Sequence, residues 1–283
     1  MACDLGFDAA GERLNVYLAR FDYGRNLDIR ELWAEMDRVW SELGLDNRKR
    51  LNYQRVVDFY AHPVWVLNGL FSELDPVSFG HRQAIARYVL KHFGAGPLLR
   101  TADVGGGSGV LACEIADAFD GRCRIDIVEP FPSEYFRRRL ALRENIQFCD
   151  SLSAGGYDVV IAQDVLEHVD QPITLALACV GAVRVKGLVL FANCFYPFIQ
   201  CHIPGTFYLR HTFRYVLESR GLTYLGTVPG AAHVQVYRRT GEVDSAAVRR
   251  RDRLARIIGP GLNHLGLIRR RFLHALRREN VRS

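Results

Sequence analysis

The sequence is poor in lysine, and its cysteines lack the spacing of a disulfide or redox framework. Only 3 of its 37 basic residues are lysines, and its seven cysteines include no C-x-x-C pair. Most of the cysteines lie in predicted apolar segments. We therefore expect reduced core residues in a cytoplasmic protein rather than disulfides.

The sequence also lacks a long hydrophobic run. Residues 1–15 carry charged side chains and no apolar centre, which argues against a signal peptide. The longest apolar stretch, residues 187–199, contains Asn193 and Pro197 and is too short to cross a bilayer. With 283 residues and 49% hydrophobic content, the chain can bury one substantial core, or one core and a cap.

Positive charge is concentrated at one end of the chain. Residues 242–283 hold 11 arginines and 4 acids, so the other 241 residues of this chain of net charge +6 sum to −1. Phosphate contacts supply much of the affinity for nucleic acids, so a neutral body argues against a nucleic-acid partner.

We expect residues 241–283 to form a basic helical tail. Apolar spacing predicts amphipathic helices over 247–258 and 262–276, with a break at Gly259-Pro260-Gly261. In the second helix, four apolar residues share one face: Leu265, Ile268, Phe272 and Leu276. Such a helix suits peripheral contact with an anionic membrane, or packing on its own domain or on a second subunit.

A glycine-rich segment lies near the middle of the chain. An apolar run leads into Thr101–Gly109, and apolar residues at helical spacing follow it. This order predicts a strand, a tight turn with positive φ, and a helix N-terminus, where a ligand can lie against the main chain. A dinucleotide fingerprint would need a small residue at position 110, which is Val110.

The pattern instead resembles motif I of class I S-adenosylmethionine-dependent methyltransferases: Asp103, Gly105, Gly107 and Gly109, at every second position. The resemblance implies that the glycines pass under the amino-acid and ribose parts of the cofactor. It also implies that Asp103 helps to hold the loop and the methionine amine.

Later segments extend the resemblance in the family's order. Glu129 ends a predicted strand about 20 residues after the glycine turn, where an acid binds ribose hydroxyls. Asp150 ends the next strand, where the family often contacts the adenine amino group. The fourth strand runs into Gln163 and then Asp164–Val169, which is very similar to the DVLEHV segment of quinone-type methyltransferases. Gln163 is a further candidate cofactor contact.

We therefore expect an α/β fold: a Rossmann-like, seven-stranded, mostly parallel sheet with helices on both faces and an antiparallel last strand. Alternating β and α segments support it independently of the resemblance. The expected domains are an N-terminal helical cap (1–98), a cofactor-binding domain (99–240), with its fifth strand over 187–192, and the tail (241–283).

Candidate substrate residues come from two regions. Aromatic residues in the cap pack as a core or form one wall of the acceptor pocket, with Tyr53, Tyr60 and His62 as candidates. A long loop over 193–211 follows the fifth strand, and loops of this length are usually functional. We interpret it as a substrate lid, which includes His202 and His211.

The chemistry is expected directly after the fourth strand. An oxygen acceptor must lose a proton, and His168 is the candidate base, with Asp164 and Glu167 presented beside it on one helical turn. Two similar families bind a divalent metal with these positions. Here Asp164, Glu167 and His168 would be the ligands, joined by His202 or His211. We prefer the metal-free interpretation, in which Glu167 and His168 orient the loop.

The expected function is methyl transfer from S-adenosyl-L-methionine to a hydroxyl of a small molecule or glycan. No Asn-Pro-Pro-Tyr motif follows the fourth strand, which argues against methylation of base or amide nitrogens. Two alternatives remain: a metal-dependent RNA ribose 2′-O-methyltransferase, and a regulatory protein that binds the cofactor without catalysis.

Overall fold

A seven-stranded sheet forms the centre of the computed structural model, which describes the backbone of residues 9–21 and 27–279 and the side chains of residues 11–21 and 27–265. The strands lie in the order β3-β2-β1-β4-β5-β7-β6. Their bounds are β1 Leu99–Val104, β2 Cys123–Val128, β3 Ile146–Cys149, β4 Tyr157–Gln163, β5 Val183–Ala192, β6 Leu222–Val228 and β7 Ala231–Arg239. Strands β1 to β5 pair in parallel, and β7 runs antiparallel to both β5 and β6. The predicted sheet is confirmed, although β5 begins four residues earlier than expected.

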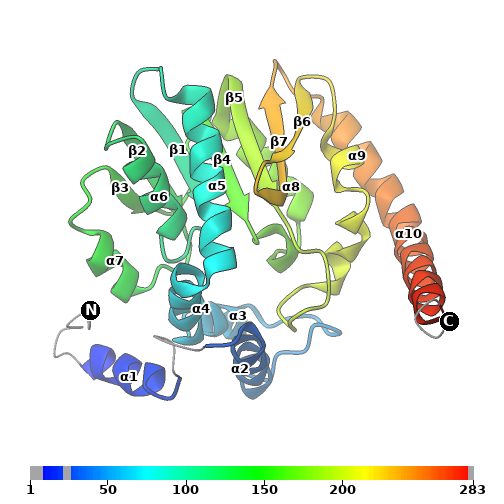
Figure 1. Ribbon diagram of the computed structural model, residues 1–283, viewed down its shortest axis with the longest axis horizontal. Helices are drawn as coiled ribbons and strands as arrows, with labels where there is room; N and C mark the ends of the chain where they lie inside the picture. The colour runs from blue at the N-terminus through cyan, green and yellow to red at the C-terminus, as the bar shows by residue number, and fades with distance from the viewer. Residues whose placement is uncertain (1–8, 22–26, 280–283) are drawn as a thin grey trace.

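Helices cover both faces of the sheet and bury one core on each. One face carries α5 (Pro76–Phe93), α6 (Val110–Ala118) and α7 (Glu134–Leu140); the other carries α8 (Pro172–Ala182) and α9 (Phe213–Leu217). The central strand β4 carries a continuous apolar run, residues 159–162, because its successive side chains there enter opposite cores. In Figure 1, α5 and α6 cross the front of the sheet. Although α5 lies within the expected cap, it packs on the sheet.

The other N-terminal helices form a separate aromatic core beyond the end of the sheet. They are α1 (Ala9–Leu18), α2 (Ile29–Glu42), α3 (Tyr53–Tyr60) and α4 (Val64–Leu74). In Figure 1 they lie below the sheet, at the end to which the β4 arrow points. Their core includes Cys201 and Ile199 from the loop after β5. Gln200 in this loop also donates its backbone N–H to Asp37 of α2. The loop over 193–211, predicted as a substrate lid, therefore packs on the helical cap and is hydrogen-bonded to it.

The C-terminal tail is one helix, α10 (Ser245–Glu279), so the predicted break at 259–261 is wrong. Pro260 removes one intrahelical hydrogen bond and crowds the carbonyl four residues before it, a cost that packing of the helix on the domain offsets. Gly259 packs against the backbone of Tyr208, where a Cβ would lie 2.4 Å from the carbonyl oxygen. Val248 and Ala255 are fully buried, so this part of the tail belongs to the core of the domain. No helix among the described residues is long and apolar enough to span a membrane.

Candidate active site

The glycine loop follows β1 at the carboxyl edge of the sheet. Gly105, Gly107 and Gly109 have φ angles of 68°, 46° and 73°, the left-handed region that favours glycine. A Cβ on Gly105 or Gly109 would lie 2.4 Å from the side chain of Val165 or Leu140, respectively. A Cβ on Gly107 would meet nothing nearer than 3.9 Å. The loop is therefore tightly packed at both ends and open in the middle.

Asp103, the first acid of the motif, is buried beside this loop. Its Oδ2 atom has no hydrogen-bond partner among the described residues. Burial raises the pKa of the carboxyl to about 7, and nearby Arg82 only partly offsets that effect. A buried carboxylate oxygen without a partner is costly unless a cation or donor meets it. This atom fits the ammonium group of an amino-acid ligand, such as the methionine part of S-adenosylmethionine.

The other cofactor candidates also lie at the carboxyl edge of the sheet. Glu129 follows β2 and accepts hydrogen bonds from the backbone N–H of Phe131 (3.1 Å) and of Gly107, so it reaches the glycine loop. Burial raises its pKa. Asp150 is exposed after β3, and Gln163 ends β4. Together with Asp103 and the three glycines, all seven positions expected to contact the cofactor thus lie at one edge of the sheet, where open α/β sheets bind ligands.

A buried polar group follows β4, on the short helix η1 (Leu166–His168). Glu167 is fully buried; its Oε1 accepts a 2.7 Å hydrogen bond from the Cys194 N–H, and its Oε2 has no described partner. Burial, followed by the charge of Asp164, raises the Glu167 pKa to about 8. Its surroundings therefore favour the neutral, protonated carboxyl more than water does.

Two histidines stand beside this carboxyl. The Nδ1 atom of His168 lies 3.2 Å from the Cys201 carbonyl, and the Nδ1 atom of His202 lies 2.6 Å from the Tyr196 carbonyl. A carbonyl only accepts, so each Nδ1 carries the proton and each Nε2 keeps a free lone pair. Burial, with a smaller effect from His202, lowers the pKa of His168 to about 3, so this ring is neutral at physiological pH.

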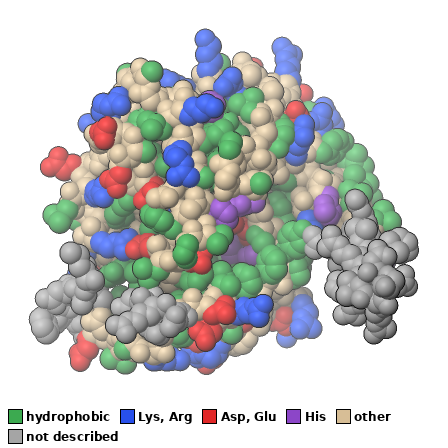
Figure 2. Space-filling view, in the orientation of Figure 1, with side chains coloured by type: hydrophobic (Ala, Val, Ile, Leu, Met, Phe, Trp, Pro, Cys, Tyr) green, Lys and Arg blue, Asp and Glu red, His purple; other side chains and the backbone are tan. Residues whose placement is uncertain are grey.

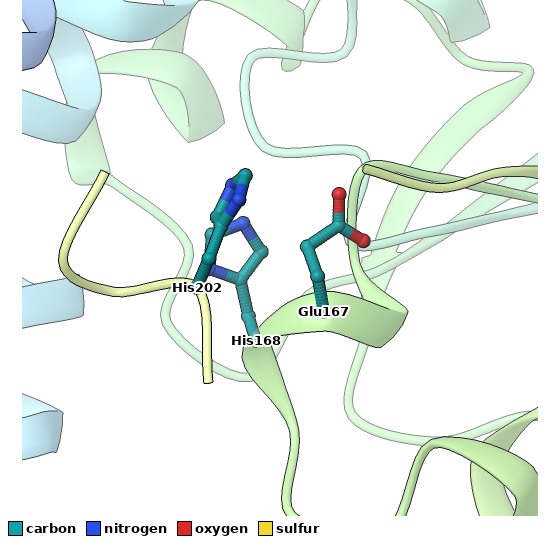
Figure 3. A group of neighbouring side chains, drawn as sticks. All are labelled: Glu167, His168 and His202. Carbon is teal, nitrogen blue, oxygen red and sulfur yellow. The ribbon is translucent and has the colours of Figure 1, made fainter. Parts of the chain in front are cut away.

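Ligand atoms of Glu167, His168 and His202 all lie within 4.8 Å of one another. Figure 3 shows His202 reaching the pair on η1 from a separate segment of chain, with its ring over that of His168. The ring centroids are 4.8 Å apart. One carboxylate oxygen and two imidazole nitrogens form a donor set that fits Mn²⁺, Fe²⁺ or Co²⁺ better than Mg²⁺.

The predicted presentation of Asp164 with Glu167 and His168 on one helical turn is wrong. Asp164 has a φ angle of 55°, its side chain is exposed, and the turn begins only at Leu166. It remains near enough to affect the pKa of Glu167. Of the two further histidines considered, His202 joins the group, whereas exposed His211 lies beyond the helix η2 (Pro204–Arg210) and outside the group.

The cap contributes one of its three candidate residues to this site. The Tyr60 ring stacks on Phe131, with centroids 5.7 Å apart, and meets the edge of His168 at 6.3 Å. Tyr53 is 77% exposed at the start of α3. His62 accepts the Val64 N–H at 3.0 Å and so stabilises the start of α4.

Sequence reasoning missed two aromatic walls of the site. Trp65 lies 6.0 Å from His168 between ring centroids, and its Nε1 has no described partner. Phe131, the second wall, could have been suspected from its position two residues after Glu129. Figure 2 shows histidine side chains gathered at the middle of this face, beside an acidic side chain and above a band of hydrophobic ones.

Comparisons with known proteins agree with this geometry. No family model matches the chain. A ubiquinone biosynthesis O-methyltransferase of Vibrio campbellii is 27% identical over 136 residues, which are 46% of this chain and 56% of the relative. The chain thus matches little more than half the length of this curated relative.

Two solved carbon methyltransferases share the architecture. The CurJ enzyme gives a TM-score of 0.56 at 12% identity, covering 83% of this chain and 72% of that one. The DszA enzyme gives 0.52 at 13% identity, covering 83% and 71%. At such identities these likenesses establish the fold alone. The chain has the fold of class I S-adenosylmethionine-dependent methyltransferases, and the resemblance expected from its sequence is confirmed.

Proposed function

We propose that the protein uses S-adenosyl-L-methionine to methylate a hydroxyl oxygen of a small molecule or glycan. The glycine loop, the unpartnered Asp103 oxygen and Glu129 support the cofactor. The similar curated relative is an O-methyltransferase. The observation that carries the choice of a hydroxyl is the half-buried imidazole of His168, with an unprotonated Nε2, on η1 just after β4.

In this proposal one set of residues binds the cofactor and the acceptor, and His168 removes the proton of the acceptor hydroxyl. The cofactor supplies the electrophilic methyl group. Asp103 would hold its amine and Glu129 its ribose, while Tyr60, Trp65 and Phe131 would exclude water and position the acceptor. A hydroxyl becomes a good nucleophile only as its proton leaves. A neutral imidazole whose Nδ1 donates to the Cys201 carbonyl can take that proton at Nε2. Because a pKa of about 3 makes it a weak base, the proton would move as the new oxygen–methyl bond forms and the acceptor oxygen becomes strongly acidic.

A metal-dependent form of the same reaction is a second candidate. It is favoured by the unpartnered Glu167 Oε2 and by its closeness to the two histidines. Glu167, His168 and His202 would hold a divalent ion, which would lower the pKa of the acceptor hydroxyl. A ribose 2′-hydroxyl of RNA would then be an eligible acceptor.

Replacing His168 tests the proposal. Methyl-labelled cofactor is incubated with fractionated cell extract, and label uptake is compared between the wild type, His168→Ala and the exposed-site control His92→Ala. We expect unchanged cofactor affinity in both variants and a fall in transfer of about 10²–10⁴ in His168→Ala alone, the usual contribution of a positioned acid–base group. An active His168→Ala protein would refute both candidates.

Chelation separates the two candidates. Under the metal-free proposal, dialysis against a chelator leaves label uptake intact. Under the metal-dependent candidate it abolishes uptake, and Mn²⁺ restores it better than Mg²⁺ because two of the three ligands are nitrogens.

A further inference from the structure

An exposed apolar stripe runs along α10, away from the active site. Ile257 is 77% exposed and Leu265 is 62% exposed. Leu254, Ile258 and Leu262 are also exposed large hydrophobic residues on the same helix. These positions recur at three- and four-residue steps and therefore form one continuous face.

This stripe is separate from the face that fastens the helix to the domain. The fastening face contains Val248, Ala255 and Gly259, which are buried. On it, Asp252 accepts a hydrogen bond from the Tyr208 hydroxyl, and the Asn263 side-chain amide donates to the Phe207 carbonyl at 2.9 Å. The helix is thus held in place without using its apolar stripe. In Figure 1 it descends the outer edge of the molecule beside α9.

The surroundings of the stripe are positively charged. Arg249, Arg250 and Arg253 are exposed and form no ion pair with a described residue. In the sequence, apolar residues continue at the same spacing at positions 268, 272 and 276, beyond the described side chains, among further arginines. Residues 242–283 carry a net charge of +7. Two copies of this helix packed stripe to stripe would bring like charges together, whereas an anionic surface would complement them.

We propose that α10 binds the surface of an anionic lipid bilayer. Its apolar stripe enters the boundary between head groups and acyl chains, and the flanking arginines meet lipid phosphates and carboxylates. The helix lies in the plane of the interface.

Vesicle co-sedimentation of the full chain tests this proposal. Vesicles contain phosphatidylcholine with phosphatidylserine, or phosphatidylcholine alone. We expect binding to the anionic vesicles, weak binding to the neutral ones, and a loss of binding as salt rises. The variant Ile257→Ser/Leu265→Ser should lower the partition coefficient about tenfold or more, since it removes two exposed anchors from the interface.

Two further variants complete the design. Arg250→Gln/Arg253→Gln should weaken anionic binding roughly fivefold per arginine. Leu142→Ser replaces a 93% exposed leucine far from the tail in the sequence and should bind like the wild type. Equal binding by all variants would overturn the proposal. So would a wild type that ignores vesicles but is dimeric by light scattering and becomes monomeric in Ile257→Ser/Leu265→Ser, because the stripe would then bind a second copy.

Discussion

The buried carboxyl of Asp103 makes a coupled prediction about stability and cofactor binding. Its folded-state pKa of about 7 lies above the ordinary 3.8 because burial disfavours the charged form. The folded protein therefore holds this proton more tightly than the unfolded chain. Burial of Asp103 costs no stability below about pH 4, where the carboxyl is protonated in both the folded and the unfolded state. As the pH rises from about 4 to about 7, the free energy of unfolding falls, because only the unfolded state releases the proton freely. The full penalty above pH 7 is on the order of 4 kcal/mol.

Asp103→Asn removes this charge while keeping the shape of the side chain. We expect the variant to be more stable than the wild type at pH 8, by at most a few kcal/mol because the amide is buried too, and equally stable near pH 4. Cofactor affinity should change in the opposite direction. The charged hydrogen bond to the amine contributes about 1.5–3 kcal/mol, so its loss weakens binding roughly 10- to 100-fold at pH 8.

The pH dependence of affinity distinguishes this role from simple packing. In the wild type the carboxyl must be ionised to bind an ammonium, so affinity should rise roughly tenfold per pH unit below pH 7 and level off above it. The Asp103→Asn variant should show a flat profile instead. Calorimetric titration with S-adenosylmethionine at pH 5.5 to 8 measures affinity, and urea denaturation measures stability, with exposed Asp120→Asn as control. A less stable Asp103→Asn protein at pH 8, or a wild type with constant affinity, would refute the reasoning.

Three further substitutions probe the cofactor site and the packing of the helices around it. Glu129→Ala should lose two ribose hydrogen bonds, roughly 2–4 kcal/mol, and weaken cofactor binding at least tenfold in a folded protein; unchanged affinity by calorimetry would remove the ribose assignment. Gly69→Ala on α4 should destabilise by about 1–3 kcal/mol, since its Cβ would lie 2.5 Å from Phe136 and 2.8 Å from Ser108. Gly80→Ala on α5, with nothing within 4 Å, should be neutral or stabilising. Equal unfolding free energies for these two glycine variants would contradict the close packing.

The site residues divide into those that the sequence could group and those that it could not. Glu167 and His168 are adjacent, so their pairing was visible in the sequence. His202 joins them from 34 positions away, because its loop folds back and is fastened to α2 at Gln200. Tyr60 and Trp65 reach His168 from the cap for a similar long-range reason. Asp164 was expected in the group because its spacing fits an α-helical turn, but its left-handed backbone places it elsewhere.

The sequence by itself determined the sheet and the glycine loop. Alternating apolar and turn segments encode strand and helix locally, and Gly105, Gly107 and Gly109 permit the positive φ angles that the turn requires. Only the tertiary structure decided which faces are used. Helix α5 packs on the sheet and not in the cap, because its buried face fits α6. Helix α10 extends through Pro260 because its inner face packs on Tyr208. Local spacing specifies a helix and its stripes, whereas the partner of each stripe depends on surfaces that distant segments create.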